Sequence, residues 1–183
     1  MSHQLLTWLS LQLDVTLFGL AIAVTHDNWI AMRNLGGALV AAGRAQEGIA
    51  QFRSSHALAP RQPGTDYQLG SALAAGGDWA GALPFFTAAV DLMPDYGSAQ
   101  YARGTALARL GRTEEAVPSL ERALTLKLDR PFQAEAHNTL GVRAAGSWNR
   151  AGAERHFRAA VELNPSLDIA RRNLEALMRG GSR

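Results

Sequence analysis

The sequence predicts an all-α fold, an α-solenoid built of stacked antiparallel helix pairs, from three observations. A glycine recurs at intervals of 34, 34 and 37 residues, at Gly36, Gly70, Gly104 and Gly141. A period in the thirties is typical of stacked helical repeats. Hydrophobic residues make up 47% of the 183 residues, enough to bury the inner faces of such helices, and the charged content of 19% is below that of a disordered chain.

Further landmarks keep the same spacing and predict how each helix pair packs. Each glycine is followed after 12 residues by a small residue, and after 16 by a large apolar one: Phe52, Phe86, Leu120 or Phe157. The glycine and the small residue let two helix backbones approach closely, and the large side chain fills the space between them. We expect the first helix of each pair to end seven residues after the glycine, because glycine accepts a left-handed backbone there. The residues at that place are Gly43, Gly77 and Gly111.

This pattern resembles the tetratricopeptide repeat, and the resemblance covers residues 29–167. It implies a right-handed superhelix whose first helices line a concave groove. It also implies a non-catalytic protein–protein interaction module, which binds a peptide or a helix of a partner protein in that groove.

The elements follow in chain order. Residues 1–28 are predicted as an N-terminal half-repeat helix, because Phe18 and Ala21 stand 34 residues before Phe52 and Ser55. Complete repeats are predicted over residues 29–62, 63–96, 97–130 and 131–167. Their helices are expected near Trp29–Ala42, Ala45–Leu58, Thr65–Gly76, Asp78–Leu92, Gly97–Leu110 and Thr113–Lys127. Asp78 and Thr113 are the expected N-caps of two second helices.

The fourth repeat departs from the pattern in two places. Three extra residues near 130–132 are expected to lengthen the link before it, and Gly146 comes five rather than seven residues after Gly141, which predicts a shifted turn. Residues 168–179 then form an amphipathic pattern that predicts a capping helix for the last pair. Residues 180–183 are predicted to be a disordered tail.

The N-terminal region leaves two alternatives open. Its run TLFGLAIAVTHDNW is similar to the junction in bacterial membrane glycosyltransferase-like proteins at which a membrane region ends and a tetratricopeptide array begins. That resemblance implies an accessory repeat domain with its N-terminal helix in contact with a membrane. The other alternative is a homodimer that forms through this helix, since residues 13–24 lack the first helix of their repeat.

The location of the protein is predicted from the same region. Asp14 in the middle of the apolar segment opposes a membrane span. Residues 1–4 carry no Lys or Arg, which opposes a signal peptide. We expect a cytoplasmic protein, with a membrane-associated or periplasmic one as the alternative.

Motifs of catalysis and of metal binding are missing from the sequence. It contains no cysteine, its five histidines are never three or four residues apart, and it has no phosphate-binding loop motif. We therefore expect that the protein is not an enzyme and that it binds no metal, no cofactor and no small-molecule substrate. Residues 143–183 hold eight arginines against four acids. We interpret them as a solvated surface rather than a nucleic-acid site, because such a site has a denser basic stripe with aromatic residues.

The resemblance implies that exposed positions of the first helices contact the partner. The candidate partner-binding residues are Arg33, Tyr67, Ser71, Tyr101, Thr105, Arg109 and Asn138. Tyrosine and arginine are enriched in binding hot spots, and the small residues between them leave room for a peptide. The alternative is that the two tyrosines only pack against neighbouring helices. A clamp for chaperone tails is not expected, because Gly37 stands where such repeats have asparagine.

Overall fold

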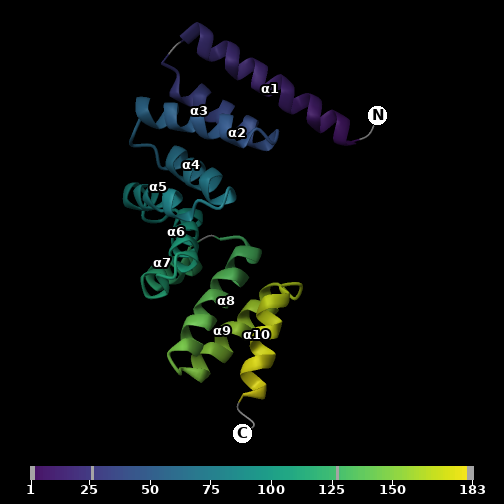
Figure 1. Ribbon diagram of the computed structural model, residues 1–183, viewed down its shortest axis with the longest axis vertical. Helices are drawn as coiled ribbons and strands as arrows, with labels where there is room; N and C mark the ends of the chain where they lie inside the picture. The colour runs from purple at the N-terminus through teal and green to yellow at the C-terminus, as the bar shows by residue number, and fades with distance from the viewer. Residues whose placement is uncertain (1–2, 26, 127, 181–183) are drawn as a thin grey trace. The chain divides into compact units, whose positions relative to one another are not determined.

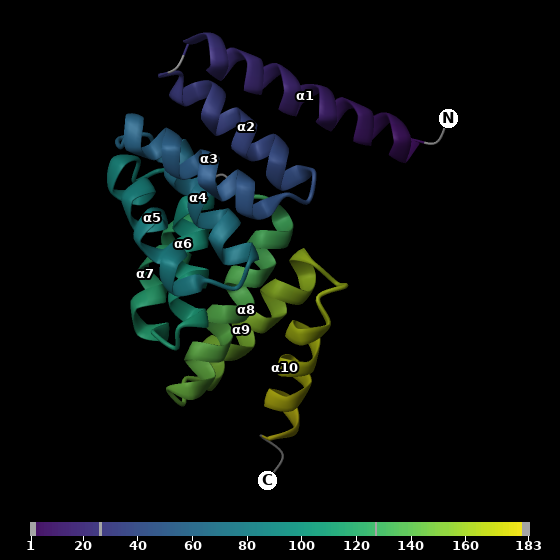
Figure 2. The ribbon, with the colours of Figure 1, turned by 45° about the horizontal axis from the view of Figure 1, so that its top comes forward.

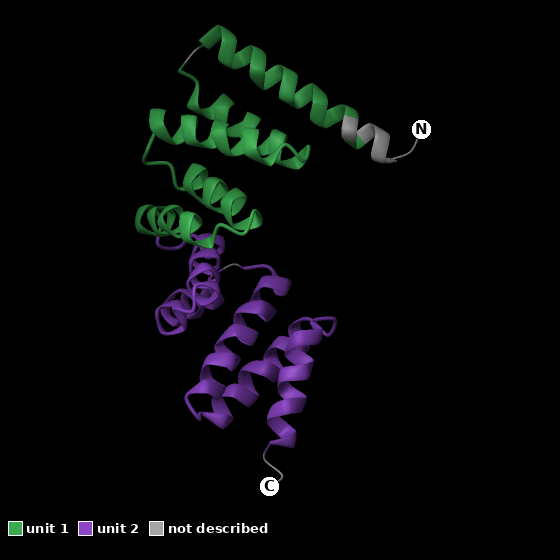
Figure 3. Cartoon of the chain, viewed as in Figure 1, with its two compact units in different colours: residues 1–93 green, residues 94–183 purple. Residues whose placement is uncertain are grey.

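The computed structural model describes residues 3–25, 27–126 and 128–180, and in these residues it contains ten α-helices and no strand (Figure 1). The prediction of an all-α fold of consecutive helix pairs is confirmed. The chain divides into two compact units, residues 1–93 and 94–183 (Figure 3). Of the predicted disordered tail, Gly180 ends the last helix and residues 181–183 lie outside the described residues.

The helices of unit 1 form two pairs and one additional helix. They are α1 (His3–Thr25), α2 (Trp29–Ala41), α3 (Ala45–Leu58), α4 (Pro63–Ala75) and α5 (Trp79–Leu92). Helix α2 packs against α3, and α4 packs against α5. Helix α3 joins the two pairs by packing against α4, while α1 lies along α2 (Figure 2).

Unit 2 repeats this arrangement with the additional helix at its other end. Its helices are α6 (Gly97–Arg109), α7 (Thr113–Thr125), α8 (Arg130–Gly146), α9 (Arg150–Leu163) and α10 (Asp168–Arg179). Helices α6 and α7 form one pair and α8 and α9 the other, and α10 packs against both α9 and α8. The described part of the chain thus has four pairs, each joined by a tight turn.

Each pair is closed by a glycine of the first helix and a large side chain of the second. The four contacts are Gly36–Phe52, Gly70–Phe86, Gly104–Leu120 and Gly141–Phe157. A Cβ atom placed on any of these glycines would lie 2.6–2.8 Å from the large side chain, closer than real Cβ contacts. The four large side chains are only 1–3% exposed. Glycine is therefore required for the two backbones to come close enough to bury the large residue.

The turns within the pairs place a left-handed residue seven positions after that glycine. Gly43, Gly77 and Gly111 have φ angles of +79°, +85° and +76°. The prediction of a shifted turn in the fourth repeat is wrong: α8 continues through Gly146, and Trp148 takes the left-handed place with φ 60°. The amides of Trp148 and Asn149 donate to carbonyls of the last turn of α8, as the corresponding amides do in the other pairs. These hydrogen bonds set the position of the left-handed residue, so tryptophan adopts a conformation that glycine adopts more easily.

The residue after each left-handed residue is the N-cap of the second helix. Asp78 caps α5 as predicted, since its Oδ1 accepts a hydrogen bond from the Gly81 amide at 2.8 Å. The prediction for Thr113 is wrong, because Thr113 is the first helical residue and Arg112 holds the N-cap position. Arg112 instead donates two hydrogen bonds to the carboxylate of Glu115, both 2.7 Å long.

The three extra residues of the fourth repeat extend a helix and leave the link unchanged. Links between consecutive pairs span residues 59–62 and 93–96 in the first repeats, and the link before α8 spans 126–129, with residue 127 outside the described residues. Helix α8 has 17 residues, whereas α2, α4 and α6 have 13 each. Pro131 lies in the first turn of α8, where its missing amide hydrogen costs no helical hydrogen bond. The expected longer link is therefore wrong.

The N-terminal region forms one continuous helix, α1, over His3–Thr25. Helix α1 exposes a row of apolar side chains: Leu9, Leu13, Leu17, Leu20 and Val24 are 45–79% exposed. In the part of the chain that the structure describes, no helix combines the length and apolar character that crossing a membrane requires.

A hydrogen-bonded ionisable pair connects the two helix pairs of unit 1. The side chain of Asp66 in α4 is fully buried, and its Oδ1 lies 2.6 Å from Nδ1 of His56 in α3. Burial raises the pKa of Asp66, and the hydrogen bond with His56 opposes this rise. The pair therefore ties α3 to α4 at a place where an unpaired carboxylate would be costly.

The glycine contact predicts different effects on stability for two adjacent substitutions in α2. Gly36→Ala should lower the free energy of unfolding by about 1–3 kcal/mol, because the new methyl group meets the Phe52 ring. Gly37→Ala should leave it unchanged or raise it by up to about 1 kcal/mol, since only Gln68 lies within 4 Å and alanine favours helix. Urea unfolding followed by circular dichroism measures both, and equal effects of the two substitutions would contradict the close-approach argument.

The left-handed Trp148 predicts a stabilising substitution. Its side chain is 94% exposed, so Trp148→Gly removes little packing and relieves a backbone conformation that costs an L-residue about 1–2 kcal/mol. Glycine also makes the unfolded chain more flexible, which offsets part of this gain. We therefore expect the free energy of unfolding to rise by about 0.5–1 kcal/mol. Gly111→Ala, at the corresponding place in the third repeat, should lower it. A loss of stability in Trp148→Gly would show that the tryptophan side chain contributes packing.

Candidate functional site

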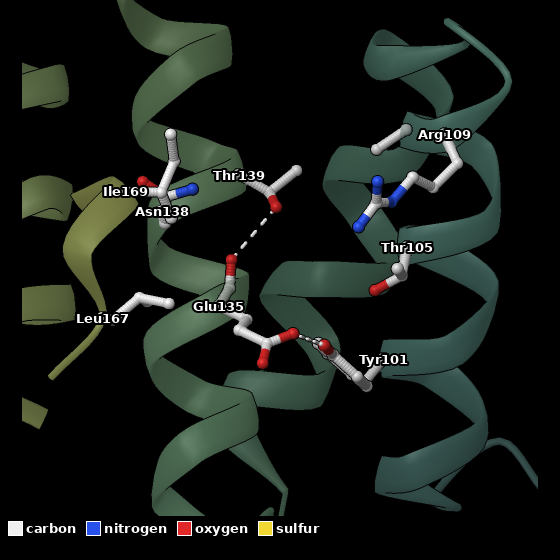
Figure 4. Close-up of a pocket in the computed structure, with 9 residues that line it drawn as sticks. Tyr101, Thr105, Arg109, Glu135, Asn138, Thr139, Leu167 and Ile169 are labelled. Carbon is white, nitrogen blue, oxygen red and sulfur yellow. Dashed lines mark hydrogen bonds between the residues drawn. The ribbon is translucent and has the colours of Figure 1, made fainter. Parts of the chain in front are cut away.

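Four of the seven predicted partner-binding residues line one cavity in unit 2. This cavity has a volume of about 430 Å³ and lies between α6, α8 and the start of α10 (Figure 4). The predicted residues in it are Tyr101, Thr105, Arg109 and Asn138. The other residues that line it are Ala108, Glu135, Thr139, Leu167 and Ile169. We call it the unit 2 cavity.

Tyr101 and Glu135 form a direct link across this cavity. The Tyr101 hydroxyl donates a hydrogen bond to Oε2 of Glu135, with an oxygen–oxygen distance of 2.5 Å. The ring of Tyr101 also contacts the ring of Phe132, with centroids 5.2 Å apart. Burial and then the hydrogen bond with Glu135 raise the pKa of Tyr101. The tyrosine thus both faces the cavity and packs against the next helix.

The two long walls of the cavity carry opposite charges. Figure 4 shows Thr105 and Arg109 on α6 across from Glu135 and Thr139 on α8. Tyr101, Thr105 and Arg109 follow one another at spacings of four residues, which places them on one face of α6. A bound segment would therefore meet an acid on one side and a guanidinium on the other.

Asn138 connects this cavity to the C-terminal helix. Its Oδ1 accepts a hydrogen bond from Nδ2 of Asn173 in α10, at 2.9 Å. Leu167 and Ile169, at the start of α10, supply apolar lining next to it. The predicted capping helix therefore also forms a wall of the cavity.

Tyr67 and Ser71 line a second cavity, in unit 1. It has a volume of about 270 Å³, and we call it the unit 1 cavity. Its other lining residues are Gly37, Val40, Phe52, Gln68, Ala72 and Ala75. The Ser71 hydroxyl donates to the backbone carbonyl of Tyr67, and the Tyr67 ring lies 6.1 Å from that of Phe86. The lining residues are mostly small or apolar, in contrast to the charged unit 2 cavity.

Arg33 lies outside both of these cavities. Its guanidinium is 5.5 Å from the centre of the Trp29 ring and donates to Oδ1 of Asn34 at 3.3–3.4 Å. Its Nη1 lies 4.0 Å from a Cβ atom placed on Gly64, so Arg33 is near the first turn of α4 but not in the lining of the unit 1 cavity.

Glu135 and Thr139 are cavity residues that sequence reasoning missed. Asn138 and Tyr101 each stand three residues before the glycine of their repeat, Gly141 and Gly104, so the glycine spacing of 37 residues matches Asn138 with Tyr101. Glu135 stands 34 residues after Tyr101, and this unshifted period is the signal that points to it. Position 135 lies on the same helix face as 138 and 139, which also indicates a shared wall.

Two histidines from different helices also meet in unit 2. Nδ1 of His137 in α8 is 3.0 Å from Nδ1 of His156 in α9. Burial lowers the pKa of both histidines. The charge of His156 lowers the pKa of His137 further. The charge of Arg155 lowers the pKa of His156 further, whereas that of Glu121 raises it. Sequence reasoning considered histidines along one helix and missed this pair. Among the residues with described positions, no group of three or more His, Cys, Asp or Glu side chains is arranged to hold a metal ion.

Comparison with known families gives a match over more than half of the chain. A family model described as Tetratricopeptide repeat matches residues 67–131 and 101–167. No curated protein sequence matches the chain significantly. The resemblance of the N-terminal run to glycosyltransferase-like proteins stays a prediction.

Several solved structures are similar to this chain. YrrB, described as a TPR protein with an unusual peptide-binding site, has a TM-score of 0.78 and 22% identity, over 94% of this chain and 87% of YrrB. MamA has a TM-score of 0.73 and 20% identity, over 82% of this chain and 86% of MamA. TTC0263, a thermophilic TPR protein from Thermus thermophilus, has a TM-score of 0.61 and 24% identity, over 96% of this chain and 94% of that protein. At identities this low, the structural similarity shows a common fold.

The histidine pair predicts a pH dependence with a definite sign. Because folding lowers both pKa values below the ordinary 6.5, the unfolded chain binds protons near that pH that the folded chain excludes. The free energy of unfolding should therefore fall as the pH falls through about 6.5, and less so in His156→Gln. Urea unfolding at about pH 7 and pH 5, with NMR titration of the imidazole protons, measures this. A titration midpoint at or above 6.5 for both rings would contradict it.

Proposed function

The chain belongs to the tetratricopeptide repeat family, and on that premise we propose that it binds a peptide or a helix of a partner protein without catalysing a reaction. Its fold is that of a protein–protein interaction module. The proposed binding surface includes the unit 2 cavity and the unit 1 cavity, both lined by first helices of the repeats.

The observation that carries this proposal is the composition of the unit 2 cavity. It combines an aromatic residue, a guanidinium, hydroxyl groups and an amide around a space large enough for side chains of a peptide. Tyrosine and arginine contribute most to binding free energy in protein interfaces when they are surrounded by packed residues. Here Tyr101 is held by Glu135 and Phe132, so little side-chain entropy would be lost on binding.

The unit 1 cavity supports the same function with a different chemistry. Val40, Tyr67 and Ala75 give it an apolar lining, which suits a short apolar side chain. YrrB, which shares the fold, is described as having a peptide-binding site. That description supports a peptide as the ligand class for this chain.

Self-association through α1 is a second candidate. The five exposed apolar side chains of this helix, from Leu9 to Val24, favour it, because a face of this kind is typical of an interaction surface. A membrane surface would cover the same residues.

Selection from a library of random peptides tests the proposal. Peptides enriched on the wild-type chain should bind Arg109→Ala about tenfold more weakly, because the variant loses the guanidinium of the cavity. Arg158→Ala is the matched control, since Arg158 is exposed on α9, is paired with Glu154 and does not line the cavity. It should change the affinity less than about twofold.

Circular dichroism must first show the same helicity in all variants. Failure of the wild-type chain to enrich any peptide would overturn the proposal. The proposal would also fall if every enriched peptide bound the wild-type chain, Arg109→Ala and Tyr67→Ala with equal affinity, because neither cavity would then contribute to binding.

A further inference from the structure

The unit 2 cavity contains a carboxylate that is not used in an ion pair. Among the ion pairs of the described residues, none includes Glu135, although four other glutamates of unit 2 pair with arginines. Glu135 is exposed, and the polar contact of its side chain is the hydrogen bond that Oε2 accepts from Tyr101. A carboxylate has about four acceptor positions, so most of its capacity is directed at the cavity or the solvent.

Aromatic rings stand next to this carboxylate. Phe132 lies one helical turn before Glu135 on α8, and its ring contacts Tyr101 at 5.2 Å between centroids with an interplanar angle of 41°. Phe132 is 41% exposed, so part of this aromatic surface faces solvent. The face of an aromatic ring attracts a cation, and a carboxylate beside it attracts the same cation directly.

The position of the other charge in the cavity determines the orientation of a ligand. Arg109 lies on the α6 wall, two turns from Tyr101, and repels a second cation there. A cationic group is thus favoured only at the Glu135 end, and acceptor groups of the ligand are favoured near Arg109.

We propose that the unit 2 cavity holds an arginine or lysine side chain of the partner peptide, with its cationic group against Glu135 and the ring of Tyr101, on which Phe132 packs. This inference rests on the proposed peptide-binding function and specifies the ligand class at that site. The carboxylate then receives charge-assisted hydrogen bonds from the ligand while it keeps the one from Tyr101.

The extra turn of α8 adds one of these groups, Phe132, directly before the turn that contains Glu135. Helix α8 is four residues longer than α6, and Phe132 and Glu135 lie in its N-terminal part. In the second repeat the helix begins at Pro63, only four residues before Tyr67, and the unit 1 cavity has no carboxylate of this kind among its described lining residues. The preference for a basic side chain should therefore belong to the unit 2 cavity alone.

The test compares peptide selections on three chains. Wild type, Glu135→Gln and Glu162→Gln are each used to select from the same random peptide library. Gln keeps the shape of the side chain and still accepts the Tyr101 hydrogen bond, so Glu135→Gln should fold normally. Glu162→Gln removes the same charge from an exposed position of α9 that does not line the cavity.

Peptides selected on wild type and on Glu162→Gln should carry Arg or Lys at one fixed position. The most enriched peptide should bind Glu135→Gln about tenfold more weakly than it binds wild type. When the basic residue of this peptide is replaced by alanine, wild type and Glu135→Gln should bind it with equal affinity. The peptide then has no cation with which the carboxylate of wild type could interact.

The outcomes separate this inference from the proposed function. Enriched peptides without a basic residue, or with equal affinity for wild type and Glu135→Gln, would overturn the inference and leave peptide binding intact. Failure to enrich any peptide on wild type would overturn both. A basic residue whose replacement by alanine affects wild type and Glu135→Gln equally would overturn the inference too, because its cation would then be bound elsewhere than at Glu135.

Discussion

The close approach of two helix backbones at a glycine is the contact on which every repeat depends. A methyl group at that position would meet the phenylalanine or leucine that fills the pair, so the distance between the helices and the burial of the large residue are coupled. Alanine and glycine are frequent elsewhere in the first helices too, beside longer polar residues. Under the proposed function, the longer residues of the unit 2 cavity, such as Tyr101 and Arg109, would supply most of the chemistry offered to a ligand.

Most of the fold was predictable from the sequence because its determinants are local and repeated. Glycine spacing predicts the pairs, and the Asp78 cap follows from the preference of short polar side chains for free helix amides. The turn at Trp148 could not be predicted from residue type, because backbone hydrogen bonds place a left-handed residue there whatever its side chain. The same turn geometry puts Arg112 at the N-cap of α7, where an Arg–Glu pair replaces the expected hydroxyl.

The candidate site was predictable in part, for a physical reason. Tyr101, Thr105 and Arg109 share a face of one helix, so periodicity alone places them together. The place of Glu135 in the cavity depends on whether the extra residues before it extend the helix or lengthen the link. Contacts with another repeat, such as that of Phe132 with Tyr101, decide between the two. Likewise, the contact of His137 with His156 is made between two helices, and their spacing along the chain does not reveal it.

The lengthened helix α8 has a consequence for how an array of similar repeats can diverge. Repeats of equal length present side chains at the same positions of their helices. Single substitutions therefore change the binding surfaces of such repeats one side chain at a time. An added turn at the start of a helix introduces new side chains into the space between repeats without disturbing the glycine contact farther along, at Gly141. Changes in helix length are thus a route by which duplicated units acquire separate specificities, and the start of α8 is a suitable place to graft new recognition residues.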